Sequence, residues 1–201
     1  MGLFTIEHGE AAYRADFALY GIAVAALAVF LPVSGPPGLQ FELLALALLG
    51  LAGWTAIEYA VHRFVLHGMA PFKRWHEEHH QRPTALIGAP TILSASLIFG
   101  LVFLPALALA GPWRASALLL GVLTGYLLYA ITHHATHHWA AESAWLKRRK
   151  RWHALHHHDA GRLGRYGVTS AFWDHVFGSA RPTALSPAEP VRRLPPQPPP
   201  P

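Results

Sequence analysis

The chain has 201 residues, of which 52% are hydrophobic and 13% are charged, a mixture too apolar for an ordinary soluble domain. It has no cysteine, which excludes disulfides, iron–sulfur clusters and thiolate-ligated haem, so any metal must be held by nitrogen or oxygen. The formal net charge of +5 comes largely from the run at residues 147–151. Next to an apolar stretch, such a run indicates contact with anionic membrane lipids, and we expect no nucleic-acid partner.

Four apolar stretches approach the roughly 20 residues that a helix needs to cross the hydrocarbon core of a bilayer. They are residues 17–33, 41–61, 90–110 and 113–131. The first is the shortest and runs into a Pro- and Gly-rich break, so whether it crosses fully stays open. Only Gly111 and Pro112 separate the last two, which predicts a tight helical hairpin. The sequence therefore predicts an all-α integral membrane protein with about four transmembrane helices.

Gly121 and Gly125 form a GxxxG spacing in the fourth stretch. This spacing lets two membrane helices approach each other closely. It also arises by chance in a helix rich in Ala, Gly and Leu, so both interpretations stay open at this stage.

The basic residues predict the orientation, because Lys and Arg in short loops stay on the cytoplasmic side. Of the sixteen, only Arg114 falls between the third and fourth stretches. We therefore expect a multi-pass protein with both termini and the histidine-rich segments on the cytoplasmic side. Residues 1–16 are expected to be an N-terminal cytoplasmic segment, 17–180 the membrane domain and 181–201 a Pro-rich disordered tail.

Fourteen of the fifteen histidines lie between residues 62 and 175, and twelve of them form four groups on one face of the predicted membrane domain. The groups are His62 and His67; His76, His79 and His80; His133, His134, His137 and His138; and His153, His156 and His157. Residues at i, i+3 and i+4 share one helix face, so each HxxHH group is expected to aim three imidazoles at one point. Imidazole suits iron, zinc, copper and nickel, and so many rings exceed one tetrahedral site. We predict two metal ions in a helical cytoplasmic cap. The alternatives are a metal-storage patch and histidines that only cap helices.

Further residues around the histidines complete a wider pattern. They are Glu58-Tyr59, Arg63-Phe64, Pro83, Tyr129, Tyr166-Gly167-Val168-Thr169-Ser170, Trp173-Asp174 and Phe177-Gly178. With this pattern the chain resembles the fatty acid hydroxylase and sterol desaturase superfamily, and within it the fatty acid 2-hydroxylases. The resemblance runs from Glu58 to Gly178, so residues 17–180 are expected to be a fatty acid hydroxylase-like membrane domain.

Carried over residue by residue, the resemblance implies ten metal ligands. They are His62, His67, His76, His79, His80, His133, His137, His153, His156 and His157. It also implies two iron ions, each with roughly one open position for O₂ as co-substrate; zinc is expected to replace iron in a recombinant sample, since imidazole sites bind it tightly. A register that uses His134, His137 and His138 in the third group stays open.

Three more residues are candidates for supporting the metal centre. Glu58 lies one helical turn before His62, where its carboxylate could fix the imidazole tautomer, and Tyr129 stands likewise to His133. Asp174 is the third candidate. The alternative for Glu58 is a charge at the membrane interface that pairs with Arg63 or Lys73.

The resemblance implies a membrane-bound, O₂-dependent hydroxylase of a lipid acyl chain, either a fatty acid or a sphingolipid-like molecule, with C2 as a candidate position. The implied partners are a lipid substrate in the bilayer and a separate electron-donor protein, because the residues before the first stretch are too few for the cytochrome domain of fungal and animal members. The alternatives are a sterol- or carotenoid-modifying hydroxylase or desaturase of the same superfamily, and a non-catalytic membrane protein that binds metal. Pro83 and Trp173-Asp174 favour the acyl branch.

Overall fold

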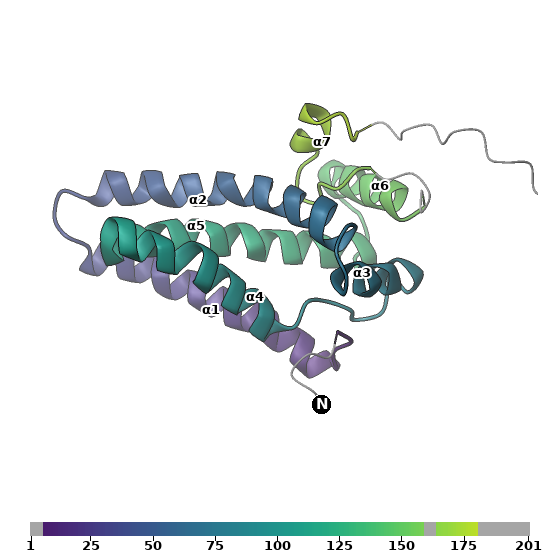
Figure 1. Ribbon diagram of the computed structural model, residues 1–201, viewed down its shortest axis with the longest axis horizontal. Helices are drawn as coiled ribbons and strands as arrows, with labels where there is room; N and C mark the ends of the chain where they lie inside the picture. Colours follow the sequence, from purple (N-terminus) through teal and green to yellow (C-terminus); the bar gives the residue numbers. More distant parts are fainter. Residues whose placement is uncertain (1–5, 159–163, 181–201) are drawn as a thin grey trace, which may run out of the picture.

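The computed structural model describes residues 6–158 and 164–180, and all regular elements in this part of the chain are helices. This confirms the all-α class. In chain order they are α1 (Glu10–Ser34), α2 (Gln40–Ala60), a π-helical segment (Val61–Leu66), α3 (Phe72–Gln81), α4 (Thr91–Ile98), a second π-helical segment (Phe99–Phe103), α5 (Leu104–His138), α6 (Ala144–His158) and α7 (Phe172–Val176). The long helices run along one axis, and α3, α6 and α7 gather at one end (Figure 1). The tail predicted for residues 181–201 lies outside the described residues.

Three helical stretches are long and apolar enough to cross a membrane, namely Glu10–Ser34, Gln40–Leu66 and Thr91–His138. The third has 48 residues, but Gly111 within it has φ 79° and ψ 173°, a conformation that glycine adopts without steric cost. The chain reverses direction there (Figure 1), so the turn predicted at Gly111 and Pro112 is present. The first stretch begins earlier than expected, since helix α1 already starts at Glu10.

The helices α2 and α5 are in direct backbone contact. A Cβ atom at Gly121 would collide with the carbonyl oxygen of Ala47, and one at Gly125 would collide with the side chain of Trp54. Both glycines of the GxxxG spacing therefore face α2, which confirms the close-contact interpretation of that spacing.

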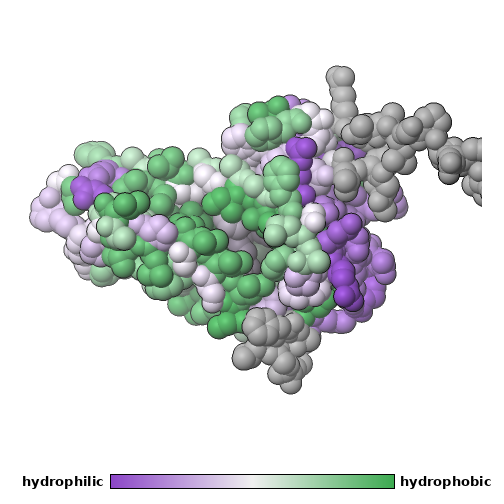
Figure 2. Space-filling view, viewed as in Figure 1, coloured by the Kyte–Doolittle hydropathy of each residue, from purple (hydrophilic) through white to green (hydrophobic). Residues whose placement is uncertain are grey.

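A hydrophobic core lies where α1, α2, α4 and α5 meet. Its buried members are Tyr20, Trp54, Ile98, Val122 and Leu123. On the outside, large apolar side chains are exposed, as a surface that faces lipid requires. Figure 2 shows hydrophobic side chains over the long helices and hydrophilic ones at the end where α3 lies.

We predict that Gly121→Ala lowers the thermal midpoint of the detergent-solubilised protein, because the added methyl group forces α2 and α5 apart; overpacking of this kind typically costs about 1–3 kcal/mol. Gly53→Ala is the matched control, since a Cβ at this helical position meets no atom within 4 Å. The control is expected to be neutral or stabilising, because Ala exceeds Gly in helix propensity by about 1 kcal/mol. Equal midpoints for the two variants would contradict the close contact.

Candidate metal centre

Ten histidines meet at the end of the bundle, and they are the ten that the resemblance implied as ligands. They form two sets of five, and within each set the ligand atoms lie within 4.8 Å of one another. The first cluster consists of His62, His67, His76, His80 and His156, and the second cluster of His79, His133, His137, His153 and His157. His134 and His138 belong to neither cluster; their rings stack on each other with centroids 4.4 Å apart.

The HxxHH groups do not aim three imidazoles at one point, and the expectation that they would is wrong. On α3, His76 and His80 enter the first cluster and His79 enters the second. The assignment on α6 is the reverse, with His156 alone in the first cluster. Neighbouring helix positions point about 100° apart, so the ring at i+3 faces one cluster while those at i and i+4 face the other. Each of these helices therefore joins the two clusters.

The π-helical segment Val61–Leu66 brings His62 and His67 together. In an α-helix, residues five apart point about 140° away from each other. Here the His67 N–H donates to the carbonyl oxygen of His62 at 3.2 Å, the i to i+5 bond of a π-helix, and the two ring centroids lie 5.1 Å apart. The widened turn is what allows one helix end to supply two rings to the first cluster.

The distances between ring nitrogens fit bound metal ions. The Nε2 atom of His76 lies 2.9 Å from that of His62 and 3.0 Å from that of His80, and the Nε2 atoms of His137 and His153 are 2.8 Å apart. Two ligands at right angles, each about 2.1 Å from one ion, lie about 3.0 Å apart. The buried ring of His79 has no hydrogen-bond partner for either nitrogen in the described part of the chain, a costly state unless another acceptor of its lone pair is present. The residues therefore fit two metal ions held by imidazole.

The ligand rings are in the protonation state that metals require. Burial, reinforced by neighbouring histidines, lowers the pKa of His79 and of His157 to about 3 and that of His80 to about 2. Desolvation disfavours the charged imidazolium, so these rings are neutral at neutral pH and keep a free lone pair.

The C-terminal segment, residues 164–179, orients two rings of the first cluster. His62 Nδ1 lies 2.5 Å from the carbonyl oxygen of Tyr166, and His156 Nδ1 lies 2.8 Å from that of Gly164. A carbonyl oxygen only accepts, so we assign the proton to Nδ1 in both rings. Their Nε2 lone pairs are then directed into the cluster.

Glu58 holds this segment and does not contact His62 directly, so that part of the expectation is wrong. Its Oε1 accepts hydrogen bonds from the backbone N–H groups of Val168 at 2.7 Å and Thr169 at 2.9 Å, and its Oε2 accepts one from the Thr169 hydroxyl at 2.5 Å. Within residues 6–158 and 164–180, Glu58 makes no salt bridge to Arg63, which donates to the Tyr59 hydroxyl, or to Lys73, which pairs with Glu77. The alternative of an interface charge paired with Arg63 or Lys73 is therefore wrong. The carboxylate acts on His62 through the loop that carries Tyr166.

Asp174 is fully buried and anchors the other end of the same segment. Its Oδ1 accepts from the Tyr166 N–H at 2.8 Å and the Ser179 hydroxyl at 2.7 Å, and its Oδ2 accepts from the Gly167 N–H at 2.8 Å. Tyr129 has a different relation to the centre, since its ring stacks on that of His133 with centroids 5.8 Å apart.

Sequence reasoning missed the carbonyl groups of Gly164 and Tyr166, since a backbone acceptor imposes no residue type. The available signal was Gly167, where a Cβ atom would collide with the carbonyl oxygen of Ser170. Such a glycine marks a tight turn, here the turn that presents the two carbonyl groups.

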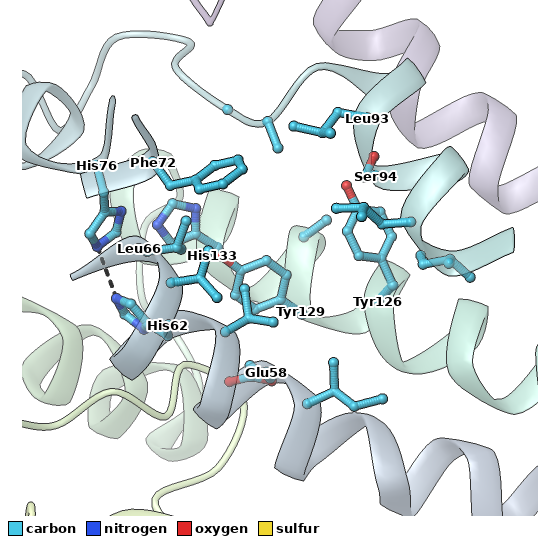
Figure 3. A pocket seen from close by; sticks show the side chains of 18 of the residues that line it. Glu58, His62, Leu66, Phe72, His76, Leu93, Ser94, Tyr126, Tyr129 and His133 are labelled. Atoms are coloured by element: carbon cyan, nitrogen blue, oxygen red, sulfur yellow. Dashed lines mark hydrogen bonds between the residues drawn. The ribbon is translucent and has the colours of Figure 1, made fainter. Parts of the chain in front are cut away.

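An apolar cavity of about 680 Å³ reaches the centre from the side of the long helices. His62, His76, His79 and His133 line its inner end, and side chains of α1 to α5 and of both π-helical segments line most of the rest. Figure 3 shows His62, His76 and His133 on one side of it and Ser94 and Tyr126 on the other. In Figure 2 a hollow among hydrophobic side chains opens between α2 and α4.

Fold and site together define a class: a helical membrane protein with two histidine clusters that could hold metal ions, beside an apolar cavity. The model of the fatty acid hydroxylase family matches residues 47–179, and the chain belongs to this family. The resemblance inferred from the sequence is confirmed.

Curated relatives and a solved structure agree with this assignment. The chain is 34% identical over 163 residues to a dihydroceramide fatty acyl 2-hydroxylase of Arabidopsis thaliana, covering 74% of this chain and 66% of that protein. It is 35% identical over 148 residues to a ceramide very long chain fatty acid hydroxylase of Schizosaccharomyces pombe, covering 67% of this chain and 42% of that protein. The structure of scs7p, in which only the hydroxylase domain is visible, superposes with a TM-score of 0.69 at 26% identity, covering 84% of this chain and 66% of the other.

We predict that Glu58→Gln lowers metal affinity about 10- to 100-fold, the usual cost of losing an indirect support of a ligand. The amide can still accept the two backbone N–H groups, but it no longer offers a second acceptor to the Thr169 hydroxyl. Metal content after equilibrium dialysis measures the effect. Glu42→Gln is the control, because Glu42 pairs with Arg114 away from the clusters. If Glu58→Gln binds metal as tightly as the wild type, Glu58 does not hold the segment in the way proposed.

Proposed function

We propose that the protein is a membrane-bound, O₂-dependent hydroxylase of a lipid acyl chain that uses two iron ions. One observation carries the proposal: the apolar cavity between the long helices ends on both histidine clusters. An acyl chain that entered it from the bilayer would meet the metal centre. The names of the relatives favour a fatty acid or a ceramide-like lipid, with C2 as the position attacked, over a sterol or carotenoid. Because the chain covers 66% and 42% of the first two relatives, their activity is carried over as a proposal.

The chain's own residues would bind and orient the metals and exclude water. When bound, the two irons supply the activation of O₂ that no side chain provides. The carbonyl groups of Tyr166 and Gly164 hold the Nδ1 protons of His62 and His156, which leaves both Nε2 atoms free as ligands. The apolar wall of the cavity, including Trp54 and Val122, keeps the reacting carbon away from water. Zinc would replace iron in recombinant protein without supporting the reaction.

We further propose four membrane crossings, with the metal centre on the cytoplasmic side. The two arms of Thr91–His138 on either side of Gly111 are each about long enough to cross, at about 1.5 Å of rise per residue. Arg114 next to this turn is the one basic residue assigned to the far side, where it pairs with Glu42. A separate protein would deliver the electrons from the cytoplasm. The proposal also includes the bounds of the membrane domain, residues 17–180.

Cysteine labelling tests the topology, since the chain has no cysteine of its own. A single Cys at the exposed position Ser143 is expected to react in intact cells only with a reagent that enters the cytoplasm. A single Cys at the exposed position Pro112 is expected to react with an impermeant reagent added outside. The reverse pattern would overturn the orientation, and labelling of both from the same side would exclude the hairpin as two crossings.

Lipid analysis of cells that express the protein with iron, O₂ and a competent electron donor tests the activity. The parent is expected to produce lipids one oxygen atom heavier, and His79→Ala is expected to abolish them because it removes a ligand of the second cluster. His175→Ala, outside both clusters, is the control and is expected to retain the product. If the parent yields no oxygenated lipid and each histidine variant loses a similar small share of metal, the protein is a metal store.

A further inference from the structure

The two clusters differ in what holds their rings. In the first cluster, His62 and His156 each direct Nδ1 at a backbone carbonyl oxygen. In the second cluster, no ring makes a bond of this geometry to a carbonyl or carboxylate oxygen of the described residues. His157 lies near the backbone carbonyl of His80, but its buried Nδ1 has no hydrogen-bond partner there. The hydrogen-bond contacts in this cluster join ring nitrogens of His137, His153 and His157 to one another. Two of the five rings of the first cluster, those of His62 and His156, are therefore fixed in tautomer and direction before a metal arrives.

The support of the first cluster is itself rigid. The segment that supplies both carbonyl groups is held to α2 by three hydrogen bonds to Glu58. Three further bonds to its own Asp174 brace it internally. Both carboxylates are buried, with exposed fractions of 4% and 0%. Hydrogen bonds accepted by carboxylates away from water are among the stronger ones in proteins, so this segment keeps its shape when no metal is bound.

A second cavity, of about 460 Å³, lies mainly beside the second cluster. It is lined by three of the five rings of that cluster, His137, His153 and His157, and by one ring of the first cluster, His80. Lys150 and Arg151 also line this cavity. Their positive charge disfavours a divalent cation nearby, whereas in the first cluster a single lysine, Lys73, acts on His67. The second cavity also gives a cation a path in and out that avoids the apolar cavity.

We infer that the two metal ions are held unequally: the first cluster binds its ion tightly, and the second cluster binds an exchangeable ion that enters through the cavity beside Lys150 and Arg151. The inference rests on the proposed two-metal function. Loss of the partners that orient ligand rings typically lowers metal affinity about 10- to 100-fold, and the affinity of the second cluster is expected to be lower by that factor.

Zinc competition against a chromophoric chelator, with apoprotein in mild detergent, measures both affinities, and elemental analysis gives the stoichiometry. Wild-type protein is expected to bind two zinc ions in two steps. Repulsion between two divalent ions would also separate the steps, so assigning them requires variants that keep one cluster intact.

His67→Ala and His137→Ala form a matched pair. Each substitution removes one of the five rings of its cluster, and both rings are half-buried. His137→Ala is expected to retain one zinc ion at the tight affinity, and His67→Ala to retain one that is about 10- to 100-fold weaker. Equal affinities, or the reverse order, would overturn the inference.

Thr169→Val tests the cause without removing a ligand, since valine keeps the shape of threonine and loses only the hydroxyl bond to Glu58. In otherwise wild-type protein, Thr169→Val is expected to lower the zinc affinity of the tight step alone. This variant keeps all ten histidines, so the inference can be tested even if a ligand variant fails to fold. An equal shift of both steps would refute the asymmetry. Fewer than two zinc ions in the wild type, or no oxygenated lipid from the iron-loaded protein, would instead refute the proposed function, so the two failures are distinguishable.

Discussion

The close approach of ten neutral imidazoles is the constraint on which the rest of the structure depends. Their ligand atoms lie within 4.8 Å of one another in each cluster, and polar nitrogens buried at such density are costly without a shared partner. The chain meets this geometry with a π-helical turn on α2 and with two helices that divide their rings between the clusters. The backbone of the membrane bundle is therefore shaped by the metal centre as much as by lipid.

A membrane helix and the C-terminal segment depend on each other through Glu58. This carboxylate lies inside a helix apolar enough to cross a membrane, where an ionisable group is expensive unless it serves a site. Its partners, Val168 and Thr169, come more than one hundred residues later in the chain. Through them the packing of α2 sets the position of the Tyr166 carbonyl and hence the direction of the His62 ring.

The two cavities have opposite character and both reach the clusters. One lies among the long helices and is lined largely by apolar side chains, and the other is lined by histidines and the basic residues Lys150 and Arg151. Such a division suits a centre that takes an apolar substrate from the bilayer while metal ions and water-soluble partners approach from the polar side. The contact of α2 with α5 at Gly121 keeps these helices together below the apolar cavity.

The sequence by itself determined the helical class and the hairpin turn at Gly111, because hydropathy and the positions of glycine and proline are local properties of the chain. Ligand chemistry singled out the histidine groups, and the choice of ten among them came from the family resemblance. The sequence did not determine how those histidines divide. Spacing alone put His76, His79 and His80 on one helix face and predicted one shared point. In the tertiary structure the two clusters lie on either side of this face, so His76 and His80 enter the first cluster and His79 enters the second. Spacing also put Glu58 next to His62, but the carboxylate faces Val168 and Thr169. Only the tertiary structure could decide this, since the partners are backbone groups from a distant segment and backbone groups leave no trace in residue identity.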